Sequence, residues 1–86
     1  DDGYDILSFY PNPTSGKTEV IFNSYRKEDV QLTVMSYDGK PLVRTSLQAV
    51  KGGNRFNLDL SGLNGNMFIV TITTTDKVYS GKLMKN

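Results

Sequence analysis

The sequence predicts an all-β fold, an immunoglobulin-like antiparallel β-sandwich of about seven short strands. Three observations support this prediction. Side chains alternate with a period of two along most of the chain. Clusters of Gly, Pro, Asn and Asp separate the alternating runs. The runs also follow one another at short intervals, as in a sandwich and unlike βαβ units.

The first predicted strand, residues 6–10, is a short apolar run that stops at Pro11. The segment Pro-Thr-Ser-Gly at 13–16 then forms a turn. The second predicted strand, residues 18–23, alternates residue by residue. Residues 24–29 are the only stretch where a short helix is an alternative to a loop.

The third predicted strand, residues 30–35, alternates in the same way, and the fourth, residues 42–47, is β-branched and apolar around Arg44. Between them lies Asp38-Gly39, one of the strongest short signals for a β-hairpin. The third and fourth strands are therefore expected to pair.

The fifth predicted strand, residues 56–61, follows a turn at 51–54, and the sixth, residues 68–73, follows a glycine-rich turn at 62–66. The seventh covers residues 77–84. Alternation places one set of apolar side chains on the inner faces of the sheets: Val20, Phe22, Leu32, Val34, Phe56, Leu58, Leu60, Phe68, Val70 and Ile72.

Size and composition exclude several classes of function. A chain of 9.6 kDa forms one domain. It has no Cys and no His, so it lacks the usual zinc ligands, the usual base at neutral pH and the residues of the common catalytic triads. A net charge of +1 does not favour nucleic acid. No apolar run approaches the roughly 20 residues that span a bilayer, so direct membrane insertion is not expected. We therefore predict a domain that is not an enzyme and uses no cofactor or metal.

Three local patterns resemble functional motifs. Gly16-Lys17-Thr18 looks like the end of a phosphate-binding loop, but Pro11 stands where that loop needs its first Gly. Residues 57–62 space oxygen atoms like half of a calcium loop, without the terminal acidic ligand. Five tyrosines, at positions 4, 10, 25, 37 and 79, are candidates for stacking on sugar rings, although half-buried Tyr is common in sandwiches.

Four segments in a fixed order carry a resemblance to a known family: "YPNPTSGK" (10–17), "SYDGKPLVR" (36–44), "NRFNLDLSGLNGNMFIVTI" (54–72) and "GKLMKN" (81–86). Together they resemble the type A C-terminal sorting domain of type IX secretion cargo, the Por secretion tail family. The family's early Pro-x-Pro falls on Pro11 and Pro13, and its terminal Lys-x-x-Lys on Lys82 and Lys85. Its Gly-x-Tyr falls on 66–68, where this chain has Asn66 and Phe68. Asn tolerates a positive φ best after Gly, and Gly65 next door offers a register shifted by one.

The resemblance implies a role in transport. Such a domain directs a fused N-terminal cargo through the periplasm and across the outer membrane of a Gram-negative bacterium to the cell surface or the medium. The implied partners are the type IX translocon and the outer-membrane shuttle and sortase-like proteins, the last of which removes the domain and attaches cargo to the surface. The residues expected to be recognised are Pro11, Asn12, Pro13, Gly16, Asn66, Phe68, Lys82 and Lys85.

The two prolines and the two lysines also carry expectations that follow from physical chemistry. The two prolines predict a stiff, polyproline-like corner that cannot pair as a central strand and so marks a sheet edge. Strict alternation places Lys82 and Lys85 on opposite sides of the last strand. Lysines there either guard the edge against unwanted pairing or allow the translocon to add a strand to it.

The start of the chain and two alternative functions complete the prediction. The sequence opens with Asp-Asp-Gly-Tyr, which suggests a piece cut from a longer protein, and residues 1–5 are expected to form an acidic linker close to the cleavage site, ahead of a sorting domain at 6–86. The first alternative is a carbohydrate-binding module of a secreted enzyme, using Tyr25, Tyr37 or Tyr79. The second is a spacer of the fibronectin type III kind.

Overall fold

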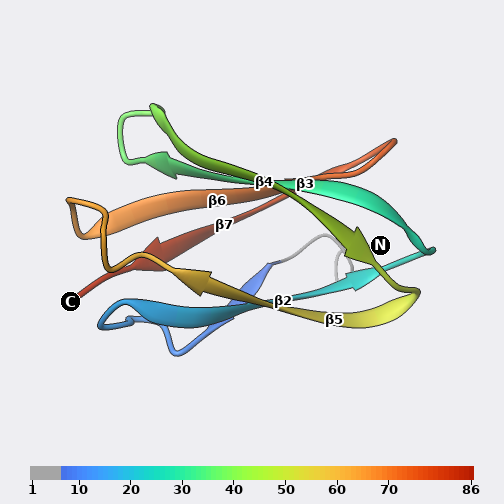
Figure 1. The fold of residues 1–86 in the computed structure, drawn as a ribbon, viewed down its shortest axis with the longest axis horizontal. Coiled ribbons are helices and arrows are strands. Elements are labelled where there is room, and N and C mark those ends of the chain that lie inside the picture. Colours follow the sequence, from blue (N-terminus) through green and yellow to red (C-terminus); the bar gives the residue numbers. More distant parts are fainter. Residues whose placement is uncertain (1–6) are drawn as a thin grey trace.

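The computed structural model describes residues 7–86 and shows two antiparallel sheets packed face to face (Figure 1). The strands are β1 (Ser8–Tyr10), β2 (Lys17–Ser24), β3 (Glu28–Ser36), β4 (Pro41–Ala49), β5 (Gly52–Asp59), β6 (Met67–Thr73) and β7 (Val78–Met84). One sheet has the order β1-β2-β5 and the other β4-β3-β6-β7. The predicted all-β sandwich is confirmed. The predicted linker at residues 1–5 lies outside the described residues.

The core lies between the sheets and consists of the side chains that alternation places inward. Of the ten predicted core residues, Phe56 and Leu58 are only partly buried, and the others are buried. Tyr79 packs its ring edge-on against Phe22, with centroids 5.4 Å apart. The buried apolar residues that the prediction omitted are Leu7, Val30, Ala49, Tyr79 and Leu83.

One alternative is excluded and one local prediction is wrong. Residues 24–29 contain a short connection and not a helix, because β2 continues to Ser24 and β3 already begins at Glu28. The fifth strand begins at Gly52 instead of residue 56, since Gly52 and Gly53 pair with the end of β2. The Asn54 side chain holds the preceding corner: Val50 N donates to its Oδ1 (2.8 Å), and its Nδ2 donates to Val50 O (2.9 Å). The chain thereby passes from one sheet to the other between β4 and β5 (Figure 1).

The short strand β1 crosses the last strand at a glycine. An added Cβ at Gly81 would lie 2.8 Å from Cε2 of Phe9 and 3.2 Å from Cβ of Leu7. Only a residue without a side chain leaves room for these two side chains, so β1 packs directly against the backbone of β7. Residues 7–86 contain no helix long and apolar enough to cross a membrane.

Candidate functional site

The predicted recognition residues lie on the corner between β1 and β2 (residues 11–16), on β7 and the residues after it, and at the start of β6 with the residue before it. The corner contains two cis peptide bonds, Tyr10–Pro11 and Asn12–Pro13. The prediction of an edge is confirmed, because β1 is an edge strand of its sheet. In Figure 1 the corner lies at the same end of the sandwich as the C-terminus.

Two threonine hydroxyls fix the shape of the corner. Thr14 is 1% exposed, and its Oγ1 accepts from Gly16 N (3.0 Å) and donates to Lys17 O (2.5 Å). Thr18, also buried, donates its hydroxyl proton to Pro11 O (2.8 Å). Three backbone groups, Pro11 O, Gly16 N and Lys17 O, are therefore paired inside the corner.

The Asn12 side chain connects this corner to β7. Its Nδ2 donates to Lys82 O (3.2 Å), and its Oδ1 accepts from Met84 N (3.0 Å). The Lys82 carbonyl and the Met84 N–H point away from β6. They face the free side of β7, which is an edge strand of its sheet. The amide of Asn12 thus takes the place of the backbone of a neighbouring strand.

Backbone hydrogen bonds extend the connection to the end of the chain. Thr14 N donates to Met84 O (2.9 Å), and Asn86 N donates to Thr14 O (2.8 Å), which makes a parallel bridge between Thr14 and Lys85. We call the set formed by Asn12, Thr14 and residues 82–86 the joint. It occupies the outer edge of β7 along this stretch, so a strand added there would first have to displace the corner.

The two lysines have different environments, as alternation predicts. Lys82 is exposed, whereas Lys85 is half-buried. Lys85 N donates to Asn66 O (2.8 Å), and its ammonium group donates to Leu63 O (2.5 Å). Lys85 therefore connects the segment between β5 and β6 to the joint. The ammonium group of Lys82 forms no hydrogen bond or ion pair with residues 7–86.

Gly16 is a buried residue that the neighbouring turn approaches closely. Its carbonyl accepts from Leu60 N (2.8 Å), and a Cβ at this position would lie 3.2 Å from Cβ of Ser61. This glycine lets the corner pack against the end of β5. Close packing against Ser61 therefore explains a glycine at this position, which is one of the predicted recognition residues.

The bend before β6 is at Gly65. This is one residue before Asn66, the position that corresponds to Gly when the family's Gly-x-Tyr is placed on 66–68. Gly65 has φ of +112°, and no non-glycine residue in the described part of the chain has a positive φ. The expectation that Asn66 replaces Gly at a positive φ is therefore wrong, and the alternative register on Gly65 has the required geometry. Phe68 is fully buried in the core, and its Cζ lies 3.7 Å from the place of a Cβ at Gly65.

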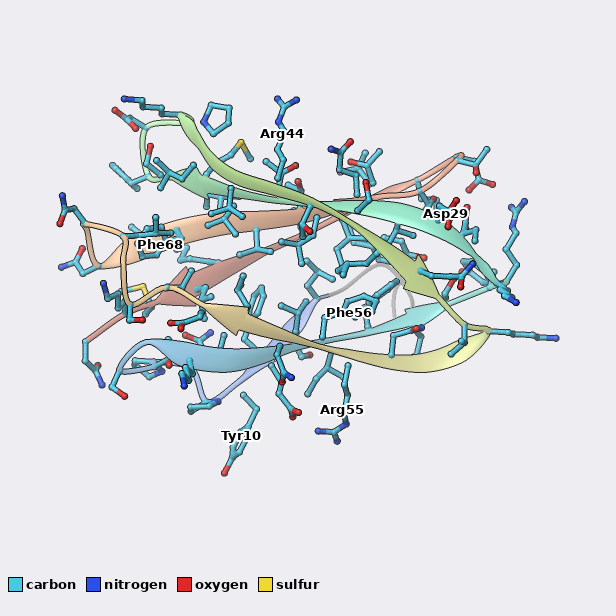
Figure 2. The ribbon with its side chains drawn as sticks, viewed as in Figure 1. Tyr10, Asp29, Arg44, Arg55, Phe56 and Phe68 are labelled. Carbon is cyan, nitrogen blue, oxygen red and sulfur yellow. The ribbon has the colours of Figure 1, made fainter. Side chains whose placement is uncertain are left out.

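Among residues 7–86 the tyrosines do not form a strip for sugar rings, and the fifth candidate, Tyr4, lies outside the described residues. Tyr79 is buried, and Tyr25 and Tyr37 lie in the connections at opposite ends of β3. Nine strand residues separate these two connections by roughly 30 Å at about 3.3 Å per residue. Tyr10 is exposed on the other sheet (Figure 2).

The carboxylate of Asp59, beside the turn after β5, accepts hydrogen bonds that lower its pKa. The Ser61 hydroxyl and backbone N–H lower the pKa of Asp59 below its ordinary value of 3.8, and Lys17 and Lys85 add to this effect. Asp59 also borders a cavity of about 420 Å³ lined by Lys17, Thr18, Asn57 and Leu58. No group of three or more acidic side chains in residues 7–86 is arranged to hold a metal ion.

Sequence reasoning missed Thr14, Leu63 and the acceptor role of the Lys82 carbonyl. The Thr-x-Gly spacing at 14–16 is a signal for a hydroxyl-capped turn and would have indicated Thr14. The other two act through backbone carbonyls, which every residue has, so no side-chain pattern indicates them.

The comparison with family models gives one finding. The model described as "Secretion system C-terminal sorting domain" matches residues 8–86. No curated protein matches the chain. The match spans the sandwich and includes the corner, both lysines and the whole joint. The chain therefore belongs to the family of secretion system C-terminal sorting domains, a family of sorting signals and not of enzymes.

Proposed function

We propose that this domain directs a fused N-terminal cargo across the outer membrane by the type IX secretion system and is then removed by a sortase-like protease. The cargo passes through the periplasm and ends at the cell surface or in the medium, in part attached to the surface. Translocon, shuttle and sortase-like proteins are the partners of the domain, and its own role is recognition.

The joint is the observation that supports this proposal. A preformed recognition surface loses little entropy on binding. The joint holds the proline corner and the last strand together through side-chain and backbone hydrogen bonds, Asn12 Nδ2 to Lys82 O and Thr14 N to Met84 O among them. Segments from opposite ends of the sequence are thus presented as one surface.

A reporter fusion tests the proposal. A periplasmic reporter enzyme carrying residues 1–86 at its C-terminus is expressed in a type IX-competent bacterium, in the same strain without the translocon, and without the domain as a control. We expect extracellular or surface reporter only in the first case. Retention of a folded fusion in the periplasm of the competent strain would refute the proposal.

The mass of the exported reporter tests removal of the domain. Cleavage before the sandwich predicts that the exported reporter is lighter than the periplasmic one by about the 9.6 kDa of this chain. Export of the intact fusion at its full mass would contradict the cleavage step and leave the transport step standing.

A further inference from the structure

All three methionines of the chain lie on the outer face of the four-stranded sheet. In the register of this sheet Met35 is opposite Ile69, Ile69 is opposite Lys82, and Met67 is opposite Met84. Their neighbours in the strands, among them Val34, Phe68, Val70 and Leu83, are buried in the core. Alternation therefore directs the methionines and Ile69 to the solvent side. We call Met35, Met67, Ile69, Lys82 and Met84 the methionine face.

The outer face of the other sheet is more polar, with Ile21 and Tyr10 as its large apolar side chains. Its positions on β2 and β5 include Glu19 and Arg55, which form an ion pair of 2.8 Å, together with Lys17, Asn57 and Asp59. Polar residues are the usual cover of a solvated antiparallel sheet. The cluster of apolar side chains on the four-stranded sheet departs from that rule, and Met84 in it is 37% exposed. Such a departure is typical of a binding surface.

The two charged strand positions nearest the methionine face are both cationic, although Asp38 lies in the adjoining hairpin after β3. Lys82 lies beside Ile69, and Arg44 on β4 lies opposite Thr33, two residues from Met35 along β3. Figure 2 shows Arg44 directed away from the sheet, whereas Asp29 lies toward the opposite end. The remaining outward positions nearby are uncharged: Gln31, Thr33, Ser46, Thr71, Thr73, Val78 and Ser80. A partner with a carboxylate complements this arrangement.

We propose that the methionine face binds an apolar protein surface that carries at least one carboxylate facing Lys82. This inference rests on the proposed function and names the surface and the chemistry by which the export machinery contacts the domain. The face lies beside the joint, because Lys82 and Met84 belong to both. Methionine side chains are flexible and polarizable, so one patch can fit successive partners.

A membrane surface is a weaker match for the same features. Each cation near an anionic bilayer contributes about 1 kcal/mol, and the face presents two, Lys82 and Arg44. The methionine face also contains no Trp or Tyr, the residues enriched at bilayer interfaces. A protein partner is therefore the occupant to which we commit.

Export of the fusion tests the inference with variants of the face. Lys82→Glu reverses the charge, Met84→Gln keeps the shape but adds polarity, and Ile69→Thr removes apolar surface. Each variant alters a residue at the centre of the proposed contact. We therefore expect each to lower the ratio of exported to periplasmic reporter about tenfold. Matched controls are Ile21→Thr, half-buried on the outer face of the other sheet, and Lys51→Glu, exposed at the corner before β5; both should export like the wild type.

The outcomes separate the inference from the proposed function. Urea unfolding of each purified fusion identifies variants that keep wild-type stability, and only these are compared for export. Wild-type export that persists in the face variants overturns the inference and leaves the proposed function intact. A wild-type fusion that stays in the periplasm overturns both. Co-sedimentation of the wild-type fusion with phosphatidylglycerol vesicles, lost in Lys82→Glu, would overturn the protein partner in favour of a lipid surface.

Discussion

Asn12 is an exposed residue whose side chain replaces part of a β-strand. Its amide donates to Lys82 O and accepts from Met84 N, so both ends of the amide pair with β7. The sequence indicates Asn12 only through the prolines beside it. Its partners lie 70 and 72 residues away, and no local pattern predicts a contact at that separation. The residue was therefore predictable as a recognition candidate, but not as a structural connection.

We expect Asn12→Ala to lower the free energy of unfolding by about 1–2 kcal/mol, because two hydrogen bonds of about 0.5–1.5 kcal/mol each are lost at a solvent-accessible site. Urea unfolding measures this loss. Amide exchange at Met84 should also become faster, since its N–H loses the acceptor on Asn12.

Asn12→Asp is the matched control for the two halves of the amide. The carboxylate keeps an acceptor for Met84 N but removes the donor to Lys82 O. Its stability should lie between those of the wild type and Asn12→Ala at neutral pH. Wild-type stability and unchanged Met84 exchange in Asn12→Ala would show that the joint does not depend on this side chain.

Among the elements, the turns carry the acid-sensitive groups. Asp38 accepts from the Ser36 hydroxyl in the hairpin between β3 and β4, and Asp59 accepts from Ser61 after β5. Both carboxyl groups have a pKa below the ordinary 3.8, chiefly because of these hydrogen bonds. The folded state therefore binds fewer protons than the unfolded state in this pH range, and stability must rise with pH.

The stabilising contribution of these turns is fully present above about pH 3.8 and is lost as the pH falls through the lowered pKa values. We expect the urea midpoint of the wild type to fall more steeply below pH 4 than that of the double variant Asp38→Asn and Asp59→Asn, whose amides accept the same bonds without titrating. Parallel curves for the two proteins would contradict this assignment.

The strands were largely predictable because each is an alternating run between strong turn signals. The Asp38-Gly39 hairpin is present, with Gly39 at φ of +91°. Prediction failed where residues with no β-forming side chain join a strand through backbone pairing alone. Gly52 and Gly53 in β5 are the example. The candidate surface role of Tyr79 is also wrong, because Tyr79 alternates in step with Leu83 and is buried with it.

At the scale of the whole molecule, the two ends of the sandwich are closed differently. At one end, side chains connect the β2–β3 and β6–β7 turns: Arg26 to Asp76 (3.0 Å), and Thr75 N to Glu28 Oε1 (3.2 Å). Arg26 and Asp76 are exposed, and pairs of this kind contribute about 0–1 kcal/mol. At the other end the joint closes the sandwich with backbone hydrogen bonds between residues 14 and 84–86. The second closure requires both ends of the sequence.

Removal of residues 82–86 therefore does more than delete two lysines. It takes away Leu83, which is fully buried, together with every hydrogen bond of the joint. Loss of a buried Leu side chain alone costs about 2–5 kcal/mol, a large share of the roughly 5–15 kcal/mol that stabilises a typical domain. We expect a fusion ending at residue 81 to show no cooperative unfolding transition for this domain, so its failure to be exported would not identify a recognition residue.

A fusion ending at residue 84 separates folding from recognition. It keeps Leu83 and the Asn12 bonds to Lys82 and Met84 but loses the contacts of Lys85 with Asn66 and Leu63. It should unfold cooperatively at a lower urea concentration than the full chain, since about three hydrogen bonds of 0.5–1.5 kcal/mol are missing. Circular dichroism of both truncated fusions against the intact one measures these differences. A cooperative transition of wild-type midpoint in the shorter fusion would mean that the sandwich closes without its last strand end, and that the joint serves recognition alone.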